Sequence, residues 1–499
     1  MPNVHEERLD EIGGHPEEGT ARGVNFTPQQ EAIFAAWRDS AANVLVGALA
    51  GTGKTSTAVA GLSQGLPGRV GFVAFNNHIA KELQSRLPPS VPACTLHALG
   101  YAAVRKAFKT ELDEQKLTKL AKLLSPDTYP SVRQAAEQLT RLCKGTLTNP
   151  AENGALASLV EHFGLEIDLR DRPRVFSLAR QLLQQSGDQT STVDFDDMVW
   201  FPHRHNLRPE QFDLLIVDEA QDLNRAQQAL AKSATASGRL CPVGDRNQAI
   251  YGFSGADCEA LPRLGRDLDA TILPLTVTWR CPQRHVTLAR RIVPELEAAP
   301  DAAEGVVRHL SRKEITAAAR PGDLIICRRN APVVGMAYKL VLAGVPAMMR
   351  GRDIGKGMTA LIRRLKPVNI RDLIDKVAEF HAREERRLMR QDAPQSAMDS
   401  LNDRCECLGQ LAAQVKTLGD LERFISERFD DQAKPGTCVV LSSVHRAKGL
   451  EAARVTILDA ARIRISHPHQ KPWQQVQEAN LHYIALTRSK DTMTFETDD

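Results

Sequence analysis

The fold of this chain is decided by the stretch NVLVGALAGTGKTS, residues 43–56. The apolar run VLVGA leads into a glycine-containing loop, and the helix-forming stretch STAVAGL follows the loop. A buried strand, a loop ending in Gly-Lys-Thr and a helix, in this order, are the context that a phosphate-binding P-loop requires. The stretch therefore predicts an α/β domain with a nucleotide site where a parallel strand meets the next helix.

The loop provides contacts for a triphosphate and for the Mg²⁺ that accompanies it. Backbone N–H groups of the loop and of the helix N-terminus can surround the phosphates. Lys54 can neutralise the β and γ oxygens, and the Thr55 hydroxyl can ligate Mg²⁺. The residues that we assign to the nucleotide here are Gly51, Thr52, Gly53, Lys54, Thr55 and Ser56. The usual pattern begins with Gly whereas this loop begins with Ala48, so the flanking strand and helix carry part of the assignment.

A second apolar run, FDLLIV, ends in the acidic segment Asp218-Glu219-Ala-Gln-Asp222. Its first two carboxylates are expected at the carboxyl edge of a sheet, where ligand sites of α/β proteins form. We assign Asp218 to Mg²⁺, because a hard cation prefers anionic oxygen, and Glu219 to the water that attacks the phosphate. A strand that ends in solvated acids is the commoner explanation of an isolated Asp-Glu pair. The upstream P-loop favours the catalytic interpretation.

The alternation of short apolar runs and helical stretches repeats along the chain. Such alternation predicts parallel strands covered by helices. Charged helical sequence without comparable strands interrupts it twice, so we expect two α/β domains, each with a mainly helical insertion. The expected divisions are a mobile tail at 1–22, a first domain at 23–100 and 188–271 around an insertion at 101–187, and a second domain at 272–365 and 434–499 around an insertion at 366–433.

Composition excludes several classes of protein. The chain has 499 residues, of which 42% are hydrophobic, and this is enough for several cores. Its net charge of +3 is far from that of a histone-like nucleic-acid coat. The nine cysteines form no Cys-x-x-Cys pair that would indicate zinc. Because no run of about 18 apolar residues and no export signal occurs, we expect a cytoplasmic protein, associated with the nucleoid if it is bacterial or viral, and no membrane contact.

Beyond these two motifs, the chain resembles the UvrD-like superfamily 1 helicases, in the correct order from about Phe26 to Lys490. The further matching segments are FTPQQ (26–30), AFNNH (74–78), TLHALG (95–100), VGDRNQAIYGF (243–253), TWRCP (278–282), VHRAKGLE (444–451) and EANLHYIALTRSK (478–490). Coincidence becomes improbable when several motifs occur in order, because their separate false-positive risks multiply. The resemblance implies two RecA-like P-loop domains that use ATP and Mg²⁺ and bind single-stranded DNA and duplex junctions.

The resemblance also assigns roles at the nucleotide. It implies that Gln30 reads adenine, with Gln29 as the alternative, and that Trp279 stacks on the base, for which an indole face is a good platform. Gln248 would sense the γ-phosphate, which Arg280 and Arg488 would also face, because a guanidinium forms paired bonds to phosphate. Gly449 would lie near phosphate and Glu451 near the ribose. The catalytic set is therefore Lys54, Glu219, Gln248, Arg280 and Arg488.

The residues that the resemblance assigns to DNA are Phe75, Asn77, His97, Tyr251, Phe253 and His445. Bases would stack on the aromatic rings. A buried position in the core is the alternative for Phe75. Ser254 stands where the family usually has Arg, so one expected DNA contact is missing. Basic residues between 328 and 366 form either a track for nucleic acid or a solvated helix face.

Three functions remain open from the sequence. The first is an ATP-dependent DNA helicase, with a 3′-to-5′ direction that only the resemblance implies. The second is a DNA-stimulated ATPase that strips proteins from DNA or regulates a partner, for instance a nuclease in replication, repair or defence. The third is a nucleotide-binding switch without motor activity. An inactive relative is expected to have lost at least one catalytic residue, and Lys54, Glu219, Gln248, Arg280 and Arg488 are all present.

Overall fold

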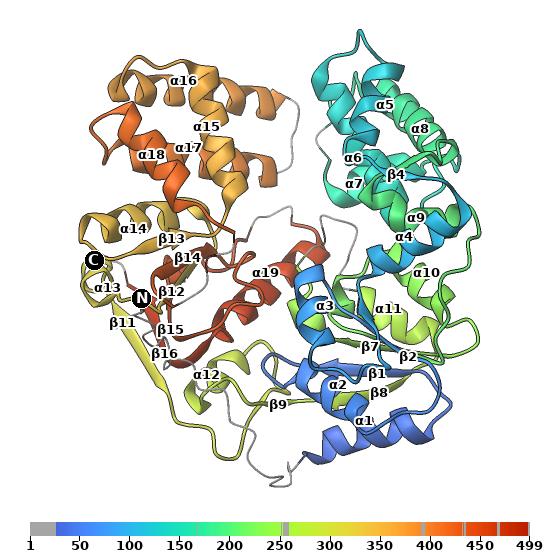
Figure 1. Cartoon of the computed structure of the whole chain (residues 1–499). Coiled ribbons are helices and arrows are strands. Elements are labelled where there is room, and N and C mark those ends of the chain that lie inside the picture. The colour runs from blue at the N-terminus through green and yellow to red at the C-terminus, as the bar shows by residue number, and fades with distance from the viewer. Residues whose placement is uncertain are drawn as a thin grey trace, which may run out of the picture.

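The computed structural model describes residues 26–165, 167–250, 252, 259–390, 395–431, 433, 436–466 and 470–497. The expected tail at 1–22 lies outside these residues, and so do Tyr251, Phe253 and Ser254. Two α/β domains form the lower part of the molecule in Figure 1, and two helical lobes stand above them. Within the described residues, no helix is long and apolar enough to cross a membrane.

The first domain is built on a six-stranded sheet in the order β3-β2-β6-β7-β1-β8, with parallel neighbours throughout. Its strands are β1 (Val44–Ala48), β2 (Val70–Val73), β3 (Ala93–Cys94), β6 (Leu214–Val217), β7 (Arg239–Gly244) and β8 (Thr271–Leu275). Its helices are α1 (Pro28–Asp39), α2 (Lys54–Ser63), α3 (Asn77–Gln84), α10 (Arg225–Ala234) and α11 (Ala260–Asp267). The sheet is buried between two apolar clusters, one on each face.

The end of the first domain differs from the expected division between 271 and 272. That division falls inside β8, which pairs with β1 from Val44 to Ala48, so the first sheet extends to Leu275. The strand is at the edge of the sheet, and Thr271 and Ile272 are exposed. An edge strand with exposed residues and a proline lacks the continuous apolar run by which the central strands were recognised.

The second domain repeats the design with the strand order β11-β16-β15-β12-β14-β13, again with parallel neighbours. Its strands are β11 (Val306–Leu310), β12 (Leu324–Cys327), β13 (Ala347–Met349), β14 (Val439–Ser443), β15 (Ala452–Ile457) and β16 (Ser489–Glu496). Its helices are α12 (Gln283–Ala289), α13 (Arg312–Ala318), α14 (Asn330–Leu342) and α19 (Pro472–Leu486). A short parallel pair, β9 (Val277–Thr278) and β10 (Glu297–Ala298), lies between the domains in sequence. The expected fold class, two parallel-sheet α/β domains with helical insertions, is confirmed.

The first helical lobe comprises α4 (Leu96–Ala107), α5 (Lys116–Leu124), α6 (Pro130–Thr146), α7 (Ala155–Phe163), α8 (Arg172–Asp188) and α9 (Phe195–Arg204). It also contains one short strand pair, β4 (Glu111–Leu112) and β5 (Thr192–Val193), which the sequence patterns did not indicate. Its apolar core runs from Val104 to Phe201 and is separate from the cores of the first sheet. The lobe therefore has a core of its own.

A buried ionic cluster lies in this first lobe. Lys116 and Lys144 each place Nζ 2.7 Å from a carboxylate oxygen of Asp197, and Lys144 also approaches Asp194 at 3.3 Å. All four side chains are almost completely buried. Removing one partner from such a cluster leaves a buried charge unpaired, so the cluster fixes α5, α6 and α9 relative to one another.

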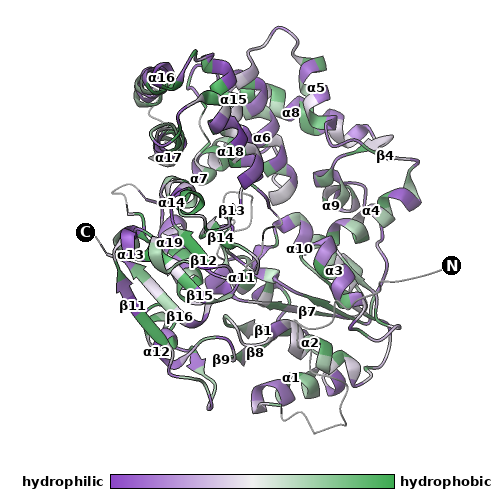
Figure 2. Cartoon of the chain, turned by 60° about the vertical axis from the view of Figure 1, so that its left-hand side comes forward, coloured by the Kyte–Doolittle hydropathy of each residue, from purple (hydrophilic) through white to green (hydrophobic). Residues whose placement is uncertain are grey.

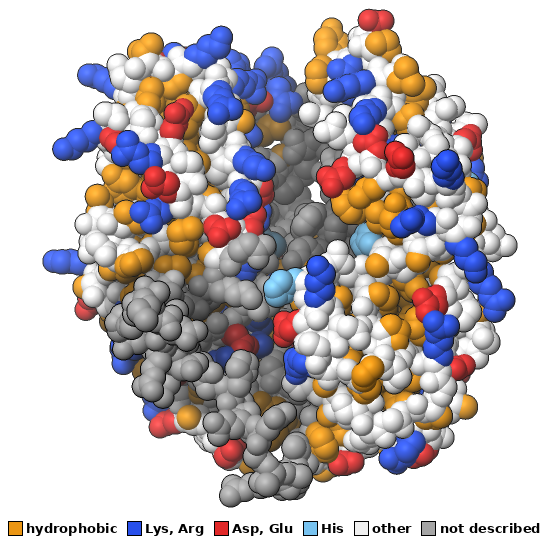
Figure 3. Space-filling view, viewed as in Figure 1, with side chains coloured by type: hydrophobic (Ala, Val, Ile, Leu, Met, Phe, Trp, Pro, Cys, Tyr) orange, Lys and Arg blue, Asp and Glu red, His pale blue; other side chains and the backbone are white. Residues whose placement is uncertain are grey.

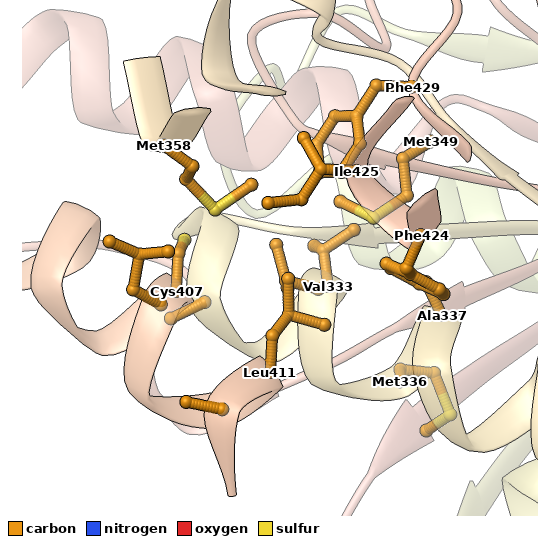
Figure 4. Packing of buried hydrophobic residues seen from close by; sticks show 14 of the residues in the cluster. Val333, Met336, Ala337, Met349, Met358, Cys407, Leu411, Phe424, Ile425 and Phe429 are labelled. Atoms are coloured by element: carbon orange, nitrogen blue, oxygen red, sulfur yellow. The ribbon is translucent and has the colours of Figure 1, made fainter. Parts of the chain in front are cut away.

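The second helical lobe comprises α15 (Arg352–Leu365), α16 (Ile370–Arg390), α17 (Gln395–Ala412) and α18 (Leu418–Arg428). Unlike the first lobe, it shares one apolar core with its α/β domain. Met358, Cys407 and Phe424 from the lobe pack in one cluster with Val333 and Met349 from α14 and β13 (Figure 4). Hydrophobic residues follow the strands and the inner helix faces, while the outer faces are hydrophilic (Figure 2).

Candidate nucleotide and DNA site

The P-loop connects β1 to α2, which begins at Lys54. Gly51 and Gly53 have φ angles of 73° and 78°, in the left-handed region that favours glycine. A Cβ atom at Gly51 would lie 2.4 Å from Oγ1 of Thr278 and 2.6 Å from Cβ of Arg280, so the loop touches the segment that follows the first sheet. At Gly53 a Cβ would meet nothing within 4 Å, so the space beside this glycine is open. Thr52 is buried and closes the loop through a hydrogen bond to the carbonyl oxygen of Leu49.

The P-loop and the acidic segment meet at the carboxyl edge of the first sheet. The Thr55 hydroxyl donates to Oδ2 of Asp218 at 3.1 Å, and Nζ of Lys54 lies 3.7 Å from Oε1 of Glu219. Ser56, one residue further along α2, is exposed. The structure thus brings together the two predicted Mg²⁺ ligands and, beside them, the predicted phosphate and water contacts.

The three acidic side chains of this segment differ in the direction in which their pKa values are shifted. Burial, and next the charge of Glu219, raises the pKa of Asp218 to about 6. Burial also acts against ionised Glu219, but Lys54 and then Lys448 outweigh it and lower the pKa of Glu219 to about 2. Burial raises the pKa of Asp222 to about 6, although the charge of Lys448 acts in the opposite direction. Glu219 is therefore ionised at neutral pH, as a residue that orients water must be.

Gln248 lies one strand away, in the short helix η2 (Arg246–Gln248) after β7. Its amide donates to Oδ2 of Asp245 at 2.8 Å, and the backbone N–H of Asp245 donates to Gln221 of the acidic segment. Both Gln248 and Asp245 are buried. A chain of contacts thus links Gln248 to the segment that carries Glu219, so a shift of one can be transmitted to the other.

Arg280 faces the P-loop from the side of the second domain. Its Nε lies 2.6 Å from Oε2 of Glu451, and its Nη1 donates to the carbonyl oxygen of Thr487 at 3.3 Å. Lys490 approaches the other oxygen of Glu451 at 2.5 Å. The carboxylate expected near the ribose therefore pairs with two cations of its own domain. Gly449, two residues before it, is exposed and has a φ of 81°.

Arg488 is buried, with 1% of its surface exposed. Its guanidinium donates to the carbonyl oxygens of Ile484 and Leu450 and to the Thr487 hydroxyl. Burial, and next the charge of Arg280, lowers the pKa of Arg488 to about 10. It lies close enough to Arg280 and Glu219 to act on them electrostatically. Contact with a phosphate would require its present hydrogen bonds to be exchanged.

The residues predicted to hold adenine are arranged around α1 and the P-loop. Trp279 is 54% exposed, and its backbone N–H donates to the carbonyl oxygen of Gly51 at 2.9 Å, which leaves the indole beside the loop. Gln30 uses both ends of its amide within the protein, since its oxygen caps α1 at Thr27 and its nitrogen donates to Thr57. Gln29 pairs with Thr276. Reading of adenine by either glutamine would therefore require these contacts to be exchanged.

Two further residues of the cleft were not assigned from the sequence, although both lie inside quoted segments. Nζ of Lys448 is 2.5 Å from Asp222 and 2.9 Å from the carbonyl oxygen of Gln248, and so joins the second domain to both catalytic segments of the first. The Tyr483 hydroxyl accepts a hydrogen bond from the backbone N–H of Ala50 in the P-loop. The sequence shows a cation at Lys448 and an aromatic residue at Tyr483. It does not show their roles, because their partners Asp222 and Ala50 are distant in the chain.

The cleft between the domains is also closed by apolar contacts. Ala50 and Ile250 of the first domain belong to the same buried cluster as Cys281, Ile484 and Leu481. The two sheets are therefore held together by packing as well as by ion pairs.

The residues predicted to contact DNA lie at the ends of strands and in loops. Phe75, which follows β2, is 47% exposed, so the structure does not place it in the core. Asn77 begins α3 and is exposed. His97 is partly buried with its ring 6.5 Å from that of Phe195, and burial lowers its pKa. Burial, followed by the charges of Arg328 and Arg446, lowers the pKa of His445 to about 3.

The polar groups that line the cleft are of the kinds that bind ATP and Mg²⁺. Thr55 and Asp218 offer a hydroxyl and a carboxylate oxygen at the start of α2, which suits a cation that takes its remaining ligands from phosphate and water. In the described part of the chain, no group of three or more His, Cys, Asp or Glu residues could hold a metal. The positive end of α2 and Lys54 complement a triphosphate.

Similarity to known proteins agrees with this geometry. Residues 26–269 match the UvrD/REP helicase N-terminal domain, and residues 353–497 match the UvrD-like helicase C-terminal domain. The chain belongs to the UvrD-like helicase family. The two matches include the P-loop and acidic segment of this helicase in the first domain, and Lys448, Glu451 and Arg488 in the second.

Three relatives illustrate this similarity. The ATP-dependent DNA helicase UvrD2 of Mycobacterium tuberculosis is 26% identical over 555 residues, which cover 93% of this chain and 77% of the relative. The ATP-dependent DNA helicase Rep of Escherichia coli is 26% identical over 284 residues, covering 50% of this chain and 41% of the relative. DNA helicase II of Salmonella typhimurium is 23% identical over 297 residues, with 53% and 39% covered. All three names describe DNA helicases.

Proposed function

We propose that this helicase hydrolyses ATP to ADP and phosphate, and that it uses the reaction to move 3′ to 5′ along single-stranded DNA and open duplexes. The observation that carries the proposal is the construction of the cleft from both domains. Lys54, Asp218 and Glu219 come from the first domain, whereas Arg280 lies against the P-loop and Lys448 reaches Asp222 from the opposite side. Nucleotide bound between two domains can change their relative position when it is hydrolysed.

The geometry supports catalytic roles for Lys54, Glu219 and Arg280. Lys54, now 3.7 Å from Glu219, would turn to the phosphates when ATP binds. Its departure removes the strongest of the three cationic influences on Glu219, so the pKa of this carboxylate rises and it becomes a better base for the attacking water. Arg280 would exchange Glu451 for the γ-phosphate and stabilise the charge that develops there.

Coupling to DNA would run through the segment that contains Gln248. This residue is tied to Asp245 at 2.8 Å, and its carbonyl oxygen accepts a hydrogen bond from Lys448. The next residues along the chain include Tyr251 and Phe253, which we propose as base contacts together with exposed Phe75. A movement of Gln248 on loss of phosphate would then alter the grip on DNA.

The second helical lobe supplies a basic surface that could guide nucleic acid. Arg352, Lys356 and Arg363 line a groove of about 560 Å³ between α15 and α18, with Ile425 and Phe429. Spacings of four and seven residues put the three basic side chains on one helix face. Figure 3 shows Lys and Arg side chains spread over this lobe, where they are mixed with acidic residues.

The decisive experiment measures ATP hydrolysis with and without single-stranded DNA or RNA, followed by strand displacement on duplexes with 3′ or 5′ tails. We expect stimulation by DNA and opening of the 3′-tailed duplex in preference to the 5′-tailed one. Stimulation without displacement would replace the proposal with that of a DNA-stimulated ATPase that acts on proteins bound to DNA. Absence of stimulation by DNA would refute the motor function itself.

A further inference from the structure

Trp473 is one of four tryptophans in the chain and has no role in the cleft described above. Trp37 and Trp200 are buried in cores, and Trp279 stands beside the P-loop. Trp473 lies in the first turn of α19 and is partly buried. Helix α19 reaches from the second sheet toward the first helical lobe in Figure 1.

Two contacts define the position of the indole. Its Nε1 donates to the carbonyl oxygen of His162 on α7 at 3.2 Å, and the Trp473 and His162 rings are stacked with centroids 5.9 Å apart at 29°. The indole also lies against the backbone of Gly252, because a Cβ atom there would come within 2.9 Å of Cζ3. Trp473 therefore bridges the first helical lobe and the segment expected to contact DNA bases.

Helix α19 is hydrogen-bonded to the first domain independently of the contacts that cover the indole. The side chain of Asn480 donates to the backbone oxygens of Arg246 and Ala249, which fixes α19 to η2. The cover consists of the His162 ring and the hydrogen bond to its backbone oxygen. A stacked ring beside one hydrogen bond is an interaction that a nucleobase can replace, since every base offers a π face.

A second, independent observation points to a missing partner beside the indole. Oε1 of Gln477 is buried without a hydrogen-bond partner, and it lies 3.1 Å from the same Cβ position at Gly252. Residues four apart on a helix lie on one face, so the Gln477 amide and the Trp473 ring face the same space. Buried polar atoms usually have a partner, and the edge of a base can provide one.

We propose that Trp473 stacks on a base of the bound single strand of DNA, that Gln477 contacts the edge of this base, and that the His162 ring covers the indole in the absence of DNA. The proposal rests on the proposed function, because it assigns a further contact on the same DNA path. In this proposal DNA displaces the His162 ring, and with it the contact between the first helical lobe and the indole. A purely structural bridge between α7 and α19 is the competing explanation.

The test compares the affinity for oligo(dT) with that for an abasic oligodeoxynucleotide of the same length. Trp473→Ala and Trp473→Leu should bind oligo(dT) about 5- to 150-fold more weakly than wild type, the range for loss of one stacked base. Trp473→Phe should restore most of the affinity. The abasic strand should bind all variants alike, because it offers no base to stack. Trp473→Leu keeps an apolar side chain at the contact with Gly252, and thermal unfolding shows whether it is folded.

Two control variants separate binding from structure. His162→Ala removes the ring that covers the indole but keeps the hydrogen bond to the backbone oxygen, and should bind oligo(dT) as tightly as wild type or more tightly. Tyr129→Ala removes another ring from the same lobe, one that is 70% exposed, and should have no effect. Wild-type affinity for oligo(dT) in folded Trp473→Leu would overturn the inference, and so would an equal loss in His162→Ala and Trp473→Ala. If wild type itself bound no single-stranded DNA, that result would refute the proposed function, on which the role of Trp473 depends.

Discussion

The two sides of the candidate nucleotide cleft differ in the groups that their proposed catalytic side chains contact. On the side of the first domain, Thr55 contacts Asp218 and Lys54 lies beside Glu219, so the residues proposed to hold ATP and Mg²⁺ are already next to one another. On the opposite side, Arg280 is paired with Glu451, and Arg488 is hydrogen-bonded to backbone oxygens of its own domain.

This difference has a physical origin. The residues of the first side lie at the carboxyl ends of neighbouring strands, so the sheet itself holds them together. On the other side, Arg488 is a buried cation and Arg280 a partly buried one, and both are stabilised by partners within the protein. In the proposed function, nucleotide would bind to a preformed half of the cleft, and catalysis would require the other half to exchange partners. This comparison can be tested by mutation on each side.

The largest effect is expected for Arg280→Ala. Loss of an arginine that stabilises the transferred phosphoryl group should lower kcat by about 10³- to 10⁵-fold. Nucleotide affinity should change much less, because the preformed half remains. Arg280→Lys should recover little activity, since an ammonium cannot form paired hydrogen bonds. Steady-state ATPase assays and binding of a fluorescent ATP analogue measure the two quantities. Activity within tenfold of wild type would remove Arg280 from the catalytic set.

The next effect concerns the preformed half. Glu219→Gln should lower kcat by about 10²- to 10⁴-fold, the contribution of a general base, while ATP and Mg²⁺ still bind. Lys54→Ala should lose turnover and ATP affinity together, because it removes the phosphate contact itself. Single-turnover hydrolysis and equilibrium binding distinguish the two variants. Near-normal turnover in Glu219→Gln would show that another group activates the water.

A smaller effect is expected from pH. The pKa of Asp218 is raised from 3.8 to about 6, so the folded protein binds more protons than the unfolded chain between these values. Without Mg²⁺, stability should therefore fall as pH rises through this range. Mg²⁺ needs the ionised carboxylate, so its affinity should fall as pH drops below about 6. Mg²⁺ titrations and melting curves at pH 5 and pH 7.5 check both statements. Asp218→Asn should remove the pH dependence of Mg²⁺ affinity and weaken that of stability, to which Asp222 still contributes because its pKa is also raised to about 6. Unchanged pH profiles in this variant would contradict the assignment.

The smallest effect is expected for Trp279, which is exposed beside the P-loop. Trp279→Ala should cost about 1 kcal/mol of ATP affinity, the scale of an aromatic stacking interaction. Trp279→Phe should recover most of it, and affinity for inorganic triphosphate should not change because that ligand has no base. Equal ATP affinity in wild type and Trp279→Ala would place adenine elsewhere and leave the phosphate contacts as the basis of binding.

Prediction from the sequence succeeded best where a function depends on residues close together in the chain. The P-loop, the acidic segment and the strands before them were placed correctly because each pattern is local. The edge strand β8 was divided between two domains, since exposed residues and a proline hide its pairing with β1. Lys448 and Tyr483 were quoted but left without roles, because their partners Asp222 and Ala50 are more than 200 residues away.

The sequence by itself determined that the chain has two P-loop-type α/β domains, with Lys54, Asp218 and Glu219 together at the carboxyl edge of the first sheet. Hydrophobic periodicity and short motifs encode such features, since both depend on neighbouring residues. Only the tertiary structure decided which groups Arg280 and Arg488 bind, that one helical lobe has a separate core while the other does not, and that Trp473 bridges α7 and Gly252. These features depend on contacts between distant segments, and packing of the whole chain selects them among many alternatives that local patterns allow.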